Sequence, residues 1–530
     1  MKKRYVAALL AGAMAISTLT GCGGSSTKPA EAKATEQAAE QTAGQAASKE
    51  TAAVVEEKPV ISILTTNASF DNNEDPALAI MEEVSGYEVV FHQLPSENTT
   101  EKLMLELASG GEYDLVCIIS PHTSVFGELI DKKALTDVSG LLNDFGADIL
   151  ANVSAAGWDS VSAEDSDAIY GVPVELARHS ANDLSGSISS GLAFRSDVLA
   201  DLGKEIPTNI DELYDVLNAF KVKTGTAPLT LAKSNGAYVA DIMSAFGLGG
   251  AFWYDVDGQY TYLVRTEGFK EYVAFMQKLY KEELLDPDMP INASENAKEK
   301  FLNSALSTFL YFWEIPSLKE SLAASNPEAK VVFAPALGKD ESDPGLIVEA
   351  TGIGRIFVVP KTAKNPEHAI KFLNSISNME NYKKIYIGEE NVSYEMKDGN
   401  YYPLFPEFTT YSNSNEFVGT PVATEQAKMW EARARKTPEM AEAFDQMNAS
   451  ANDKNYYFSP EAYAGSLPTM TEYYASLQST INDIVIKGIV EGEDAQAVVD
   501  EAITAWERDG GLEIEAEMQA WYAENKHLFE

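Results

Sequence analysis

The pattern of hydrophobic positions changes near Pro59. Beyond it, short apolar runs typical of strands alternate with segments whose apolar residues recur every three or four positions, as in helices. We predict strands at 60–64, 87–91 and 114–119, and helices at 78–84 and 101–108. The last strand is continuously apolar, as in a sheet covered on both faces. This β-α-β-α-β order predicts a doubly wound α/β lobe.

The pattern predicts further strands and helices up to the end of the chain. A constrained extended segment at 170–175 precedes further predicted strands at 191–195, 307–313, 330–335 and 354–359. Pro207 and Thr208 open a helix for which Thr208 is the expected N-cap, and another helix is expected at 269–284. Trp253 is expected to be structural, beside a hairpin turn near Gly258. Residues 410–530 are mainly helical in pattern.

Composition narrows the possible classes of protein. With 530 residues and 45% hydrophobic residues, the chain can build a packed core and more than one lobe. The 81 acidic residues against 40 Lys and Arg give a net charge of −41, which argues against nucleic acid and polyanionic partners. Two Cys cannot form a disulfide scaffold, and five scattered His predict no metal site. No signature of a catalytic or cofactor-binding loop is present, so we expect no cofactor.

The first 22 residues have the pattern of an export signal. Three basic residues, at positions 2–4, precede an apolar run at 6–16, which is too short for a stable membrane span; an anchor helix is the alternative. The segment ends in Leu-Thr-Gly-Cys at 19–22 and resembles the bacterial lipobox. That resemblance implies cleavage after residue 21, lipidation of Cys22 and anchoring on the extracytoplasmic face of the membrane. Acyl chains on one Cys hold a protein at a membrane without any spanning helix.

A stalk is predicted between the anchor and the folded part. Residues 25–57 are rich in Ala and Glu and contain no aromatic residue, Leu, Ile or Met. Such a segment cannot bury enough apolar surface to offset its chain entropy, so a flexible tether is expected at 22–57. No second hydrophobic segment of spanning length follows, which argues against a transmembrane receptor or a permease.

Five segments together resemble the bacterial extracellular solute-binding proteins of sugar-type ABC transporters, the family of the maltose-binding protein. They are GEYDL at 111–115, YGVP at 170–173, FRSDVL with IPTNIDELY at 194–214, LYKEELLDP at 279–287 and VVPKTAKNPEHA at 358–369. The resemblance covers about residues 58–525 and is strongest for the longer, oligosaccharide-binding branch. Some members of that branch carry a calcium loop after the "EL" helix. Residues 221–226 hold no acidic side chain there, so we expect no calcium site.

The resemblance implies a two-lobed α/β fold with a hinged cleft and a helical C-terminal part. Lobe 1 would comprise 58–170 with about 350–400, and lobe 2 would comprise 171–349 with part of about 400–530. The chain would cross first within 170–175 and again within 336–351, so that 60–119 and 354–376 share one sheet. The implied function is capture of a saccharide and its delivery to an ABC permease, without catalysis, by a protein that we expect to be a monomer.

A saccharide site needs aromatic rings for apolar sugar faces and planar polar groups for hydroxyls. By resemblance, the stacking aromatic residues of the second lobe are Trp313, Tyr238, Tyr473 and Tyr474, and core packing is the alternative for each. Glu175 matches a hydroxyl-binding carboxylate, against the alternative of an interlobe salt bridge with Arg178.

The first lobe should contribute the loops that follow its strands, since ligands of such sheets bind outside the carboxyl ends of the strands. Asn67 and Asp71 follow the first strand, and Ser120 and His122 follow the strand at 114–119. Ordinary solvated loops are the alternative. Two other functions stay open: a secreted polysaccharide-degrading enzyme, for which carboxylate pairs abound, and a binding protein for a peptide or another small solute.

The lipobox leads to a direct prediction. Replacement of Cys22 by Ala removes the only sulfur that the predicted lipid could modify, so the variant should leave the membrane fraction and keep its leader uncleaved. Fractionation and the mass of the N-terminal peptide measure both effects. A variant that stays as tightly attached as the wild type would contradict the lipobox interpretation.

Overall fold

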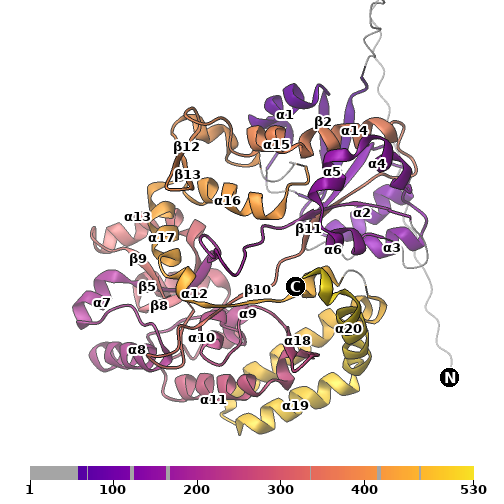
Figure 1. The fold of residues 1–530 in the computed structure, drawn as a ribbon. Coiled ribbons are helices and arrows are strands. Elements are labelled where there is room, and N and C mark those ends of the chain that lie inside the picture. The colour runs from indigo at the N-terminus through magenta and orange to yellow at the C-terminus, as the bar shows by residue number, and fades with distance from the viewer. Residues whose placement is uncertain are drawn as a thin grey trace, which may run out of the picture. The chain divides into compact units, whose positions relative to one another are not determined.

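The first sheet has five strands, in the order β2-β1-β3-β11-β4, in the computed structural model of the protein (Figure 1). The structure describes residues 58–67, 70–119, 125–162, 168–334, 336–414, 419–464 and 467–529. The strands are β1 (Ile61–Thr65), β2 (Val89–Gln93), β3 (Leu115–Ile119), β4 (Val172–Glu175) and β11 (Ile353–Val358). β1 pairs in parallel with β2 and β3, whereas β11 runs antiparallel to β3 and β4. The prediction that the first three strands share a sheet with the segment near 354 is confirmed.

Helices cover both faces of this sheet, which explains the continuously apolar sequence of β3. Leu115 and Cys117 pack in one core with α1 (Ala77–Ser85), α14 (Pro366–Ser377) and α15 (Met379–Tyr386). Val116 and Ile118 face the other way, toward α2 (Thr99–Ala108) and α3 (Val125–Asp131). Cys117 is a buried thiol that packs here as a small hydrophobic residue.

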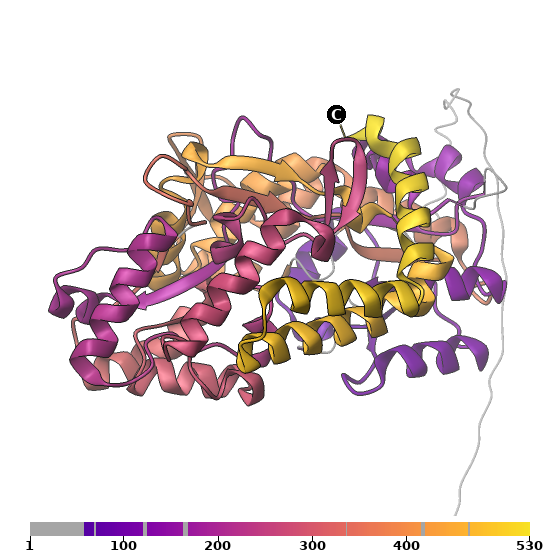
Figure 2. The ribbon, with the colours of Figure 1, turned by 90° about the horizontal axis from the view of Figure 1, so that it is seen from below.

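The second sheet is antiparallel, in the order β8-β5-β9. Its strands are β5 (Ser190–Arg195), β8 (Ser307–Tyr311) and β9 (Val331–Ala334). One face packs with α8 (Ile210–Thr224), α11 (Glu267–Lys281) and the long C-terminal helices α18 (Pro468–Glu491), α19 (Ala495–Arg508) and α20 (Gly511–Asn525), which Figure 2 shows in yellow. The opposite face packs with α13 (Ile315–Ser325) and α17 (Pro438–Asn448).

Smaller elements complete the fold. A hairpin joins β6 (Trp253–Val256) and β7 (Gln259–Tyr262) through Asp257 and Gly258, whose positive φ angles of 54° and 85° fit a tight two-residue turn. The remaining elements are η1 (Asn72–Glu74), α4 (Ser139–Phe145), α5 (Ala147–Asn152), α6 (Ala155–Asp159), α7 (Ser196–Leu202), α9 (Lys233–Gly236), α10 (Ala240–Ser244), η3 (Leu263–Arg265), η4 (Met289–Ile291), α12 (Ser294–Asn303), η5 (Phe312–Glu314), β10 (Leu346–Glu349), β12 (Tyr394–Lys397), β13 (Asn400–Pro403), η6 (Glu407–Tyr411), α16 (Ala423–Ala434), η8 (Ala451–Asp453), β14 (Asn455–Phe458), η9 (Pro460–Tyr463) and η10 (Lys526–Leu528).

The chain passes between the two sheets later than the sequence predicted. Strand β4 (Val172–Glu175) still pairs with β11 in the first sheet, and the second sheet begins only at Ser190. The first crossing therefore follows Glu175 and does not lie within 170–175. Pro173 lacks an amide hydrogen, and it fits here because β4 lies at the edge of the sheet and pairs with one strand only. The return between β9 and β11 falls where it was expected.

One helix cap also differs from the prediction. Asn209, and not Thr208, is the N-cap of α8, because its side chain accepts a hydrogen bond from the amide of Glu212 at 2.9 Å. Thr208 instead donates its amide and its hydroxyl to the carboxylate of Glu212. Asn209 thus provides the N-cap, and Thr208 and Glu212 add further hydrogen bonds at the start of the helix.

Side chains cover part of the outer edge of β2, the edge strand of the first sheet. Asn73 accepts a hydrogen bond from the amide of Phe91 and donates one to its carbonyl, both at 2.9 Å. The carboxylate of Glu82 accepts from the amide of Val89 at 2.9 Å. Main-chain groups that a further strand would need are thus already bonded.

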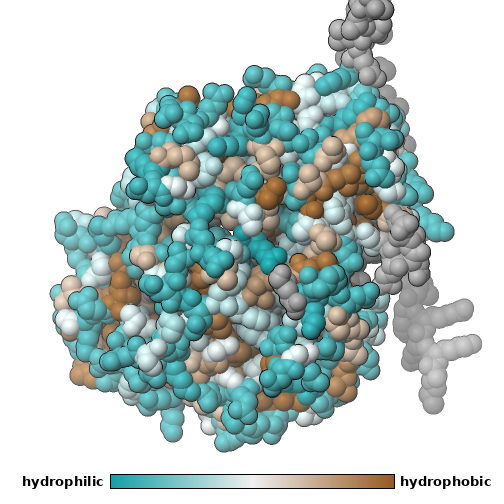
Figure 3. Space-filling view, viewed as in Figure 1, coloured by the Kyte–Doolittle hydropathy of each residue, from teal (hydrophilic) through white to brown (hydrophobic). Residues whose placement is uncertain are grey.

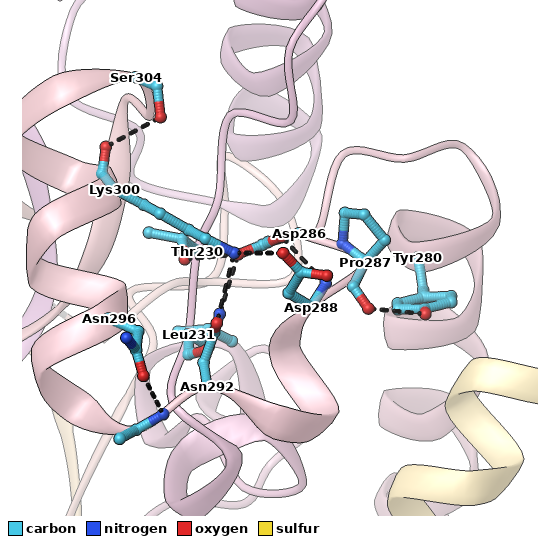
Figure 4. A network of polar contacts seen from close by, with 11 residues as sticks. Thr230, Leu231, Tyr280, Asp286, Pro287, Asp288, Asn292, Asn296, Lys300 and Ser304 are labelled. Carbon is cyan, nitrogen blue, oxygen red and sulfur yellow. Dashed lines mark hydrogen bonds and ion pairs between the residues drawn. The ribbon is translucent and has the colours of Figure 1, made fainter.

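A cation–carboxylate network around the buried Asp286 fixes the segment between α11 and α12 (Figure 4). The ammonium of Lys300 lies 2.7 Å from Asp286 and 2.8 Å from Asp288. Asp286 also accepts hydrogen bonds from Thr230 and Asn292, each at 2.9 Å. Burial alone would raise the pKa of Asp286, but the hydrogen bonds, led by that of Lys300, outweigh it and hold this pKa below its ordinary value.

Replacement of Lys300 by Met should lower the free energy of unfolding by about 3 kcal/mol at neutral pH, because the carboxylate of Asp286 would stay buried without its cation. A carboxyl with a lowered pKa in the folded state stabilises the protein above its unfolded pKa and loses that contribution as the pH falls. The difference between variant and wild type should therefore shrink below about pH 4, as measured by urea unfolding.

Lys339 provides the matched control, since its ion pair with Glu271 is more than half exposed on both sides. Its replacement by Met should change the free energy of unfolding by less than about 0.5 kcal/mol. Equal losses in the two variants would contradict the structural role of the Lys300 network.

Candidate functional site

Trp313 follows strand β8 and is exposed at the protein surface. At the end of the strand Leu310 is buried and Tyr311 is 39% exposed, as expected from strand alternation. In the short helix η5 that follows, Phe312 is buried and Trp313 is 44% exposed. The two exposed rings stack with centroids 4.3 Å apart and an interplanar angle of 18°. An exposed indole is suited to contact an apolar ligand face, and Trp313 is not the buried core residue of the alternative reading.

Polar contacts fix the turn that carries the indole. The carboxylate of Glu314 accepts a hydrogen bond from the amide of Tyr311 at 2.9 Å and pairs with Lys298 at 2.6 Å. Hydrogen bonds with Glu295 and Glu314 raise the pKa of the Lys298 ammonium. The short helix η5 is thus held at its start by one of its own side chains.

Tyr238 and Tyr474 pack against the core of the second sheet, unlike the exposed Trp313. Tyr238 packs between Phe252 and Phe269, with centroid distances of 5.5 and 6.1 Å. The hydroxyl of Tyr474 accepts a hydrogen bond from the indole of Trp253 at 3.2 Å. Burial raises the pKa of both hydroxyls well above the ordinary value. In this structure both rings follow the core-packing alternative, because neighbouring aromatic rings occupy their faces and edges.

Tyr473 is 41% exposed and borders a cavity of about 720 Å³ between α18 and the α19–α20 junction. Its ring lies over Gly510, where an added Cβ would stand 3.4 Å from the ring, and the φ of 105° also favours glycine. The cavity carries mainly hydroxyl and charged side chains: Thr469, Ser476, Thr480, Glu507, Arg508, Asp509 and Glu513.

Glu175 is buried and fastens β4 to its surroundings. Its carboxylate accepts hydrogen bonds from the amide of Ser154 at 2.8 Å, from the hydroxyl of Ser154 at 2.6 Å and from the hydroxyl of Tyr463 at 2.7 Å. Arg178, the expected alternative partner, instead lies over the ring of Phe458 at 4.0 Å. With 2% of its surface exposed, Glu175 acts here as a structural acceptor.

The candidates of the first lobe separate in space. Asn67 is 4% exposed, and its carbonyl accepts a hydrogen bond from Gln93 at 3.1 Å. Asp71 is exposed, caps η1 through Asn73 and borders a cavity of about 590 Å³ along β2 and α2. Ser120 and His122 lie outside the described residues, as do Cys22 and the stalk at 22–57.

The sequence analysis missed a second carboxylate between the sheets. Glu349, at the end of β10, accepts hydrogen bonds from the amide of His179 at 3.1 Å and from the hydroxyl of Tyr456 at 2.6 Å. His179 belongs to the first crossing and Glu349 to the second, so the pair ties the two crossings together. Its members lie 170 residues apart, so no local motif could reveal it. Tyr311, in contrast, was visible as an aromatic residue two positions before Trp313.

The described part of the chain was compared with the requirements for a metal site and for a membrane-spanning helix. Within it, no three or more His, Cys, Asp or Glu side chains gather as metal ligands. The carboxylates of Asp286 and Asp288 already hold the ammonium of Lys300. No helix among the described residues has the length and apolar character needed to cross a bilayer. Figure 3 shows a largely hydrophilic face on which apolar residues are scattered.

Comparison with known proteins gives a consistent result. The model of the family described as bacterial extracellular solute-binding protein matches residues 71–383. A protein of Niallia circulans, named after the butB 5′ region, is 31% identical over 258 residues, which are 48% of this chain and all of that protein. Lipoprotein LipO of Bacillus subtilis strain 168 is 22% identical over 487 residues, covering 88% of this chain and 93% of LipO.

Solved structures agree on the fold. The alginate-binding protein AlgQ2 superposes with a TM-score of 0.63 at 18% identity, covering 88% of this chain and 99% of AlgQ2. The substrate-binding protein FusA of S. pneumoniae, in complex with kestose, gives 0.62 at 17% identity, with coverages of 88% and 100%. These likenesses confirm the predicted two-lobed α/β fold.

Proposed function

We propose that this chain, which belongs to the bacterial extracellular solute-binding proteins, captures a carbohydrate between its two lobes and delivers it to an ABC permease. The observation that carries the proposal is the exposed, stacked indole of Trp313 at the end of β8. A saccharide ring presents an apolar C–H face that fits an aromatic face, and it needs polar partners around its rim. An oligosaccharide is the ligand class that we propose.

The names of related proteins support a carbohydrate. AlgQ2 is named for alginate, and FusA was solved with kestose. One ligand is acidic and the other neutral, so the fold accommodates both kinds of sugar. The net charge of −41 favours a neutral ligand for this chain, since the summed field repels anions.

A lipid anchor at Cys22 is the second part of the proposal. The leader, the lipobox and the stalk are features of the sequence, and the relative LipO is named a lipoprotein. The anchor would hold the binding domain at the extracytoplasmic face, within reach of the permease. Acylation of one cysteine supplies the necessary membrane affinity.

We assign the lobes from the two sheets. Lobe 1 would contain residues 58–175 and about 350–400, and lobe 2 would contain 190–335 with the C-terminal helices. Closure around a ligand would be a shift between conformations that contacts to both lobes favour. The carboxylates Glu175 and Glu349 lie beside the crossings and would act as fixed points of the hinge.

Two other functions serve as alternatives in the test. A polysaccharide-degrading enzyme would convert the bound oligosaccharide, whereas a binding protein returns it intact. A peptide-binding protein would respond to peptides and not to sugars. The family and the structures compared above are binding proteins, which favours capture without conversion.

Wild-type protein should therefore gain thermal stability with kestose, an alginate oligosaccharide or another member of an oligosaccharide panel, and leave the sugar unchanged. Replacement of Trp313 by Ala should weaken binding roughly ten- to a hundredfold, from the loss of ~1–3 kcal/mol of ring contact. Calorimetry measures the affinity, and chromatography of the recovered sugar measures conversion.

The unfolding midpoint should hardly change in that variant, because Trp313 is 44% exposed. Phe405, which is 51% exposed and whose ring contacts Phe408 in the core of the first sheet, provides the control, and its replacement by Ala should leave affinity intact. Unchanged affinity in a folded Trp313→Ala protein would remove the indole from the site. Sugar turnover, or a response to peptides alone, would contradict the proposed function.

A further inference from the structure

We propose that Tyr311 is a positioning residue, which holds the indole of Trp313 in its binding orientation without contacting the ligand. The inference rests on the proposed function, because it concerns the ring that we assign to the saccharide. It adds a residue to which neither the sequence motifs nor the comparisons give a role.

Three aromatic rings of β8 and its extension form one continuous stack. Phe309 contacts Tyr311 edge to face, with centroids 5.7 Å apart and an angle of 86°. Tyr311 then lies nearly parallel to Trp313, at 4.3 Å and 18°. Phe309 and Tyr311 are two residues apart in β8, so the pleat of the strand carries both side chains to one side. Trp313 lies in the short helix η5 that follows, and its ring returns onto that of Tyr311.

Tyr311 covers one face of the Trp313 indole, so a ligand can stack only on the other face. A parallel neighbour at 4.3 Å leaves no space for a sugar ring between the two aromatic rings. Trp313 is nevertheless 44% exposed, so we take the face opposite Tyr311 as the one that a ligand would contact. Trp313 should accordingly bind one sugar ring on that face.

The neighbours of the stack restrain the indole from other directions. Phe312 is fully buried and meets Trp313 edge to face at 5.2 Å and 78°. The backbone amide of Tyr311 is held by Glu314, whose carboxylate is in turn held by Lys298. An exposed tryptophan without such neighbours would lose rotamer freedom on binding, and a ring already fixed avoids that entropy cost.

The test replaces Tyr311 by Leu and by Phe. Leu removes the aromatic face and Phe keeps it without the hydroxyl. With the oligosaccharide that binds best in a panel containing kestose and an alginate oligosaccharide, Tyr311→Leu should weaken affinity about three- to tenfold, and Tyr311→Phe should stay within about twofold. In a Trp313→Ala background, Tyr311→Leu should cause no further loss of affinity.

The fluorescence of Trp313 without ligand reports on how firmly its indole is held. The chain has six Trp, so the signal of Trp313 is taken as the difference between each protein and its Trp313→Phe counterpart. Tyr311→Leu should give this signal a faster anisotropy decay and stronger quenching by acrylamide, and Tyr311→Phe should not. The unfolding midpoint should remain unchanged, because Tyr311 is 39% exposed.

Several results would overturn the inference. Equal losses with Leu and Phe would show that the hydroxyl contacts the sugar, and a loss that persists without Trp313 would show that Tyr311 acts on its own. An unchanged anisotropy decay in Tyr311→Leu would show that the indole needs no support. If the wild type bound no oligosaccharide, the proposed function would fail and the inference with it, whereas a wild type that binds while Tyr311→Leu behaves identically would refute the inference alone.

Discussion

The insertion of β11 between β3 and β4 is the constraint on which the arrangement of this chain depends. β11 (Ile353–Val358) pairs antiparallel with a strand on each side, although both neighbours precede it by about 180 residues or more. The whole second sheet is therefore formed by an excursion that leaves the first sheet after Glu175 and must return to a fixed register. Such non-local pairing carries a large loop-closure cost before its contacts form. The cores on both faces, to which β11 contributes Phe357 and Ile356, offset that cost.

Carboxylates with little exposed surface hold the segments that leave and re-enter the first sheet, and Glu349 joins the two. Glu175 binds Ser154 and Tyr463, and Glu349 binds His179 and Tyr456. Burial is the main cause that raises the pKa of both tyrosine hydroxyls far above the ordinary value, so they remain donors over the physiological pH range. Hydrogen bonds to charged acceptors are strong and directional, so these contacts fix the strand ends while the chain between them can adjust.

The sequence revealed the elements whose signals are local. The apolar period identified β1, β3 and α1, because one helix face or strand face packs into each core. The cap of α8 was displaced by one residue, since Thr208 and Asn209 are both capable acceptors and only the tertiary path decides between them. The first crossing was placed too early because the YGVP segment at 170–173 resembles the crossing of the family, whereas here Pro173 lies in an edge strand, which tolerates it.

The candidate site was less predictable than the fold. Tyr238, Tyr473 and Tyr474 have the same chemistry in the sequence, yet one is exposed and two pack against other aromatic rings. Neighbouring residues of one helix point in different directions, and only the helices around them determine which ring reaches the solvent. The partner of Glu175 could not be identified either, because Tyr463 lies 288 residues away.

The covered edge of β2 has a consequence for encounters between copies of the protein. Asn73 bonds both main-chain groups of Phe91, and Glu82 bonds the amide of Val89. A second copy that approached this edge would have to break these bonds before it gained any of its own. Crowding raises the rate of such encounters but does not remove the need to break these hydrogen bonds first. The cover thus disfavours continuous sheets between neighbouring molecules.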